Sequence, residues 1–81
     1  MPMALIEEFQ PVSSDTQKLH GPVTCGYRTF TVDGRRVLQL DTYGSPDRQI
    51  HGKISQSIQL DGDSARDLLK IIEDSFPDLA H

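Results

Sequence analysis

The dipeptide Asp33-Gly34 constrains this chain more than any other feature, because it lies between two runs suited to β-strands. Residues 23–32 read VTCGYRTFTV and residues 37–43 read VLQLDTY, and both runs are rich in β-branched and aromatic side chains. Asp-Gly favours a two-residue type I′ turn, which needs positive φ at both positions. Such a turn places Val32 opposite Arg35 and sets the register of the whole hairpin.

This register divides the hairpin into two faces, because opposed residues share a face and successive residues alternate. The predicted core face holds Cys25, Tyr27, Thr29, Leu38 and Leu40. The other face holds Gly26, Arg28, Gln39 and Asp41, with Phe30 and Val37 near the turn. On this prediction the single cysteine points into the core, where such a side chain is usually an inert small hydrophobe.

A third strand and a helix are predicted after the hairpin. The strand covers about residues 53–60, and matching the apolar sides places Ser55, Ser57 and Gln59 beside Arg28, Gln39 and Asp41. Residues 61–64 offer N-cap candidates, and apolar residues at helical spacing then predict an amphipathic helix that ends before Pro77. The predicted core comprises Tyr27, Leu38, Leu40, Ile54, Ile58, Leu60, Leu68, Leu69, Ile72 and Phe76.

The predicted fold class is therefore α+β: an antiparallel sheet of three or four strands with one C-terminal helix packed on one face. Residues 1–21 are expected to be partly irregular or an edge strand, and residues 22–81 form a single β-β-β-α domain. A chain of 81 residues, 36% hydrophobic and without tryptophan, builds only a small core. Self-association would bury more apolar surface, so we expect a homodimer.

Composition also bears on location. No apolar run approaches the length of a membrane span, and the first residues lack the basic start of a signal peptide. Cys25 is the only cysteine, so an internal disulfide is excluded. These features predict a cytoplasmic protein that does not enter a membrane.

No motif in the chain supports catalysis or metal binding. Gly52-Lys53-Ile54-Ser55 departs from a phosphate-binding loop, because Ile54 interrupts the Lys-Ser pair and a strand follows it. His20 and Cys25 are too few for a zinc site. We therefore expect no catalytic residues, metal ligands or cofactors, and the sequence leans away from an enzyme.

Polar and basic side chains nevertheless gather in the middle of the chain. Residues 25–60 carry five of the eight basic residues, although the whole chain has a net charge of −4. Arginine and lysine donate fixed hydrogen bonds, serine and glutamine adapt theirs, and tyrosine offers a ring for stacking. The candidate binding residues are Arg28, Gln39, Asp41, Tyr43, Ser45, Arg48, Lys53, Ser55, Ser57 and Gln59.

Two resemblances bear on this interpretation. LDTYGSPDR at residues 40–48, followed by GKISQSIQLD at residues 52–61, resembles a family of small uncharacterised bacterial proteins, and the likeness covers roughly residues 23–76. It implies a stand-alone domain and no particular activity. The order of strands and helix also resembles single-strand binders of the transcriptional-coactivator type, which pair their helices in a dimer.

The sequence predicts a small non-enzymatic interaction module whose partner is a second copy or another protein. The alternative is a weak binder of single-stranded nucleic acid or another anion, which would use the polar sheet face and the loop at residues 44–53. Net acidity counts against strong nonspecific nucleic-acid binding, since that rests on many phosphate contacts.

Overall fold

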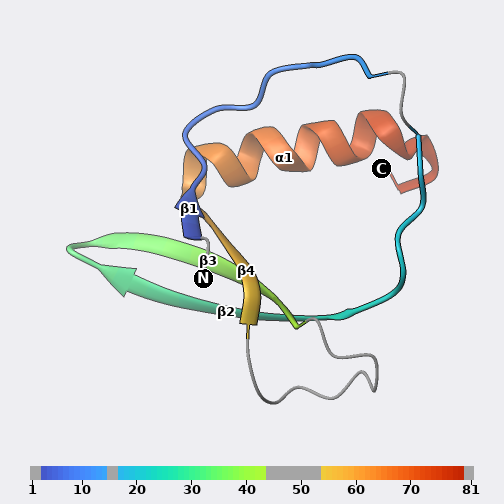
Figure 1. The fold of residues 1–81 in the computed structure, drawn as a ribbon. Helices are drawn as coiled ribbons and strands as arrows, with labels where there is room; N and C mark the ends of the chain where they lie inside the picture. The colour runs from blue at the N-terminus through green and yellow to red at the C-terminus, as the bar shows by residue number, and fades with distance from the viewer. Residues whose placement is uncertain (1–2, 15–16, 44–53, 80–81) are drawn as a thin grey trace.

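A computed structural model describes residues 3–14, 17–43 and 54–79 of the chain. These residues form one four-stranded sheet and one C-terminal helix, which is the predicted α+β arrangement (Figure 1). The strand order across the sheet is β1-β4-β3-β2. The elements are β1 (Met3–Leu5), β2 (Thr24–Val32), β3 (Arg35–Tyr43), β4 (Ile54–Leu60), α1 (Gly62–Ser75) and the short 3₁₀ helix η1 (Pro77–Leu79).

The central hairpin has the predicted turn and register. Asp33 has φ 52° and Gly34 has φ 79°, so both turn residues adopt the left-handed backbone that a type I′ turn requires. Val32 pairs with Arg35, and the antiparallel pairing continues to Thr24 opposite Tyr43. Asp-Gly thus fixes which side chains share each face of the hairpin.

Strand β1 makes the sheet mixed, whereas the sequence predicted only antiparallel pairing. It runs parallel to β4, with Met3 opposite Ser57 and Leu5 opposite Gln59. The Ile6 amide extends this pairing with a 2.9 Å hydrogen bond to the Gln59 carbonyl. Because a long connection separates β1 from β2, the N-terminal segment can reach the far edge of the sheet in a parallel orientation.

Helix α1 begins and ends as its sequence indicates. Asp61 is the N-cap, and its carboxylate accepts a hydrogen bond of 3.0 Å from the Ser64 amide while the Ser64 hydroxyl accepts one of 3.1 Å from the Asp61 amide. This reciprocal capping box satisfies two free donors at the start of the helix. Phe76 is the C-cap, directly before Pro77. The helix follows β4 directly, and β4 is the strand that it mainly contacts (Figure 1).

The prediction of the core was wrong in two respects: it missed one buried hydrophobic residue, and most of the residues that it included are half-buried or exposed. Within the described residues, the buried hydrophobic side chains are Val37 and Leu60, and of these only Leu60 was expected. Cys25 and Tyr27 on the predicted core face are exposed, and Leu38 and Leu40 are only half-buried. The other predicted core residues are half-buried at Ile54 and Leu68 and exposed at Ile58, Leu69, Ile72 and Phe76.

The opposite face of the sheet contains the most deeply buried sheet side chains apart from Leu60, and most of them are polar. Gln39, Asp41 and Ser57 are between 3% and 6% exposed. They lie on the two central strands, where side chains from the outer strands flank them. Polar groups tolerate this burial only when they are hydrogen-bonded.

No helix among the described residues is long and apolar enough to cross a membrane.

Candidate functional site

The polar face of the sheet, formed by Arg28, Gln39, Asp41, Ser57 and Gln59 with their neighbours, is the first candidate surface. Side chains of β3 and β4 on this face are joined by a continuous row of hydrogen bonds. The Gln59 amide donates to Oε1 of Gln39 at 2.9 Å, and the Gln39 amide donates to Oδ1 of Asp41 at 2.9 Å. The Ser57 hydroxyl donates to the same Asp41 oxygen at 2.5 Å. Every donor in this row therefore leads toward one final acceptor, the Asp41 carboxylate.

The carboxylate of Asp41 is kept ionised by these donors. The Ser57 hydroxyl lowers the pKa of Asp41 most, the Gln39 amide lowers it next, and the positive charge of Arg28 adds to both effects. Burial of the carboxyl acts in the opposite direction and is outweighed. Asp41 is therefore an acceptor, and its Oδ1 oxygen accepts two hydrogen bonds within the protein.

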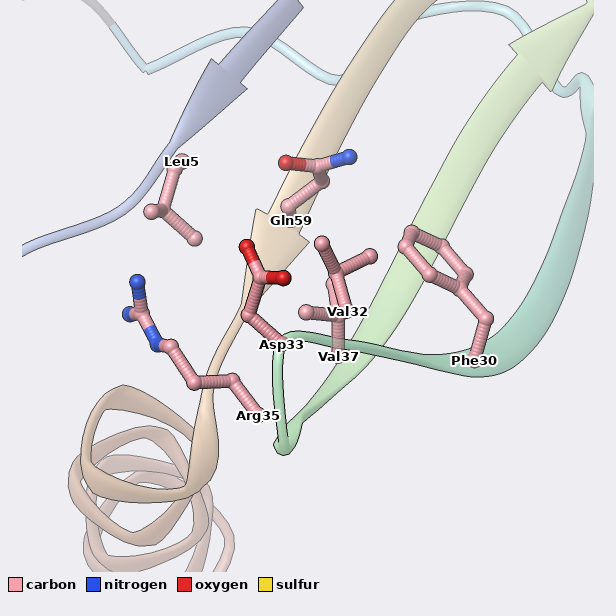
Figure 2. A pocket seen from close by; sticks show the side chains of 7 residues that line it. All are labelled: Leu5, Phe30, Val32, Asp33, Arg35, Val37 and Gln59. Atoms are coloured by element: carbon pink, nitrogen blue, oxygen red, sulfur yellow. The ribbon is translucent and has the colours of Figure 1, made fainter.

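A hollow of about 220 Å³ opens on the same face beside this row (Figure 2). Leu5, Phe30 and Val37 supply apolar walls from three strands, and Gln59 projects from β4. Asp33 and Arg35 lie at the turn end (Figure 2). Arg35 is held there by a 2.8 Å ion pair with Asp61, the helix N-cap. The hollow combines an apolar interior with a charged rim, and no residue of α1 lines it.

Aromatic rings and one arginine lie along the polar face, from Phe30 beside the first hollow to Tyr43 at the opposite end of the hairpin. The Arg28 guanidinium lies over the Phe30 ring, 5.7 Å from its centroid. The Tyr43 ring lies over Gly26, where an added Cβ would come within 3.2 Å of a ring carbon. Arg28, Asp41 and Tyr43 help to line a second hollow of about 400 Å³. A cation beside two rings can interact with a flat or anionic ligand.

The structure divides the predicted binding residues into three groups. Gln39, Asp41, Ser57 and Gln59 come together as the hydrogen-bonded row, flanked by Arg28 and Tyr43. Ser55 is not part of this row. The strand register shifts at Thr42/Tyr43, and the Ser55 hydroxyl instead forms a hydrogen bond of 3.0 Å with the Thr42 hydroxyl. Ser45, Arg48 and Lys53 lie outside the described residues.

Sequence reasoning missed the apolar part of this surface. Leu5 and Phe30 line the first hollow, yet neither was included among the binding candidates. The hairpin register already placed Phe30 on the face of Arg28, so that signal was available. For Leu5 it was not, because the parallel pairing of β1 with β4 joins segments far apart in the sequence.

The second candidate surface is an apolar stripe on α1. Leu69 is 57% exposed, Ile72 37% and the C-cap Phe76 61%, and we call these three residues the helix stripe. Ser64 at the start of the helix is buried and Leu68 is half-buried. The rest of the described chain therefore covers α1 at Ser64 and partly at Leu68, and leaves the helix stripe exposed.

Within the described part of the chain, no group of three or more histidine, cysteine, aspartate or glutamate side chains could hold a metal ion. The two surfaces are thus a polar face with hollows and an apolar helix stripe, and neither has the arrangement of a metal centre. Comparison with protein-family models, curated proteins and solved structures finds no match to this chain.

Proposed function

We propose that this chain is a small interaction domain that works as a homodimer through its helix stripe. The observation that supports it most is the exposure of Leu69, Ile72 and Phe76 at helical spacing. A helix in a globular protein is stabilised mainly by packing of its apolar face. An uncovered face of this kind on an ordered helix is the usual mark of a protein contact.

The small core supports the same proposal. Val37 and Leu60 are the buried hydrophobic side chains of the described residues, while Tyr27 on the sheet is 79% exposed. A domain near this size gains limited stability from its own core. Burying the helix stripe against a second copy would add apolar area where the single chain lacks it.

The proposal is tested by the mass of the protein in solution. Sedimentation at micromolar concentration should give twice the 9.1 kDa chain mass. Phe76→Ser should shift the protein toward the monomer, because the ring is exposed in the single chain and would be buried in the dimer. Val12→Ser is the matched control, since Val12 is 89% exposed and lies outside the stripe. A wild-type monomer at these concentrations would contradict the proposal.

A second function, binding of single-stranded nucleic acid to the polar face, is favoured by one specific observation. Arg28 lies over Phe30 beside the half-buried ring of Tyr43, so a cation and two rings share one face of the sheet. Bases stack on such rings, and arginine pairs with phosphate. Two observations count against nucleic-acid binding. Gln39 and Ser57 already donate hydrogen bonds to Asp41, and the chain carries net negative charge.

Titration of a labelled single-stranded oligonucleotide at low salt tests this second function. Arg28→Ala and Phe30→Leu should each weaken binding, and affinity should fall as salt rises because counterions are released. Lys70→Ala on α1 is the control, because it removes the same charge away from the polar face. Equal losses for Arg28→Ala and Lys70→Ala would indicate nonspecific attraction and reject the polar face as the site.

A further inference from the structure

Three apolar residues of α1, together with its C-cap Phe76, follow the spacing of a two-helix seam. Ala65, Leu69, Ile72 and Phe76 are separated by four, three and four residues, which places them along one side of the helix. Ala65 is half-buried and the other three are exposed. We call these four residues the seam; it consists of the helix stripe and Ala65.

Two opposite charges border the seam on the same side. Arg66 follows Ala65 and Glu73 follows Ile72, and these two charged residues lie seven residues, or about two turns, apart. Arg66 is exposed and Glu73 is half-buried. The only contact of Arg66 with an acid among the described residues is to Asp63 at 3.4 Å, where both side chains are largely exposed. Such a pair contributes little, so Arg66 can exchange it for another partner.

From this pattern, and resting on the homodimer proposed above, we infer that two copies pair their α1 helices antiparallel, with Arg66 facing the partner's Glu73. A two-fold axis brings the same flank of both helices together. Each Arg66 then meets the partner's Glu73, and the symmetry repeats the ion pair. The flank is therefore complementary to itself in charge, and this complementarity selects a second copy as the occupant of the stripe.

The same register also fits the shapes of the seam residues. With Arg66 level with the partner's Glu73, the axis passes between Leu69 and Lys70, so Leu69 packs beside the partner's Leu69. Phe76 then lies near the partner's Ala65, so the largest seam residue meets the smallest. The remaining seam residue, Ile72, lies between the partner's Ala65 and the partner's Leu69. Charge and size thus favour one register independently.

Charge reversal tests the pairing. Arg66→Glu and Glu73→Arg should each weaken the homodimer roughly tenfold at low ionic strength, because two surface ion pairs become two repulsive contacts. The double variant R66E/E73R should recover most of the affinity. An equimolar mixture of the two single variants should form a heterodimer, which native mass spectrometry detects when one variant is isotopically labelled.

The controls are Lys70→Glu and Asp74→Arg, which make the same changes of charge on α1 without altering the seam flank. Circular dichroism should show that every variant keeps its helix. A wild-type dimer in which R66E weakens association no more than K70E, or in which R66E/E73R does not recover, would overturn the pairing and leave the homodimer standing. A monomeric wild type would remove both.

Discussion

Ser57 on β4 and Asp41 on β3 are direct cross-strand neighbours, and their side chains are joined by a hydrogen bond of 2.5 Å. The Asp41 oxygen that accepts this bond also accepts from Gln39, which in turn accepts from Gln59. Four side chains therefore form one row across the two central strands. Because each buried polar group relies on the next, loss of one member leaves another without a partner.

Replacing Gln39 by leucine tests the row as a unit. The change deprives Asp41 of a donor and Gln59 of an acceptor, so we expect the free energy of unfolding to fall by about 1–3 kcal/mol. Urea unfolding followed by circular dichroism measures the loss. Gln56→Leu is the control, because Gln56 is exposed and lies opposite Thr42 on the other face. An equal effect of the two changes would mean that the row contributes nothing specific.

The row also predicts how stability responds to acid. Hydrogen bonds from Ser57 and Gln39 lower the pKa of Asp41 below 3.8, and those from Ser64 and Arg35 do the same for Asp61. A carboxyl whose folded pKa is lowered adds stability that is present above the unfolded pKa and lost as pH falls through the folded one. Unfolding midpoints in urea should thus be level above roughly pH 5 and fall below pH 3.8.

Asp41→Asn separates the two carboxyls in this experiment. The variant should be less stable at neutral pH and should lose less stability on acidification, because only Asp61 then contributes the effect. Protein concentration must be held constant, since a dimer is stabilised by mass action. A variant with the same acid dependence as the wild type would show that Asp41 does not contribute to it.

The sequence contained enough information for the path of the chain and too little for the location of the core. Asp33-Gly34 fixed the hairpin register, and Asp61 with Pro77 bounded the helix, because these are local signals that act within a few residues. The register also placed Gln39 and Asp41 on one face. The prediction failed at the next step, where the opposite face of the hairpin was taken as the core.

The physical reason is that both faces of the hairpin mix apolar and polar residues. Phe30 and Val37 share the face of Gln39, while Tyr27 shares the face of Leu40, so counting apolar side chains did not distinguish them. Burial of Gln39 depends on the Gln59 amide of the neighbouring strand and on the Asp41 carboxylate two residues along its own strand. Alternation alone does not reveal these partners. The register shift between Thr42 and Tyr43, where the pairing passes from Gln56 to Ile54 and skips Ser55, was not predicted either.

The capping box at the start of α1 gives a third prediction. Ser64 is 1% exposed, and its hydroxyl accepts from the Asp61 amide while donating toward the same residue. Ser64→Ala should lower the free energy of unfolding by about 1 kcal/mol, because one helix-start donor loses its partner. Thermal unfolding measures it. Ser75→Ala, at the exposed C-terminal end of the same helix, should be nearly neutral and serves as control.

The last prediction compares two leucines that the sequence placed together in the core. Leu60 is 2% exposed, so Leu60→Ala should cost about 2–5 kcal/mol at any protein concentration, because it opens a cavity within one chain. Leu69 is 57% exposed, so in the single chain Leu69→Ala should change stability by less than about 0.5 kcal/mol.

If the helix stripe is the dimer contact, the cost of Leu69→Ala should instead grow as concentration rises, because the dimer contributes stability only when it forms. Urea unfolding of both variants and the wild type, from low micromolar to several hundred micromolar chain, measures this dependence. A cost for Leu69→Ala that stays small across the whole range would mean that this leucine is solvated in the dimer as well. Association would then have to use another surface, and the exposed Tyr27 side of the sheet would be the next to test.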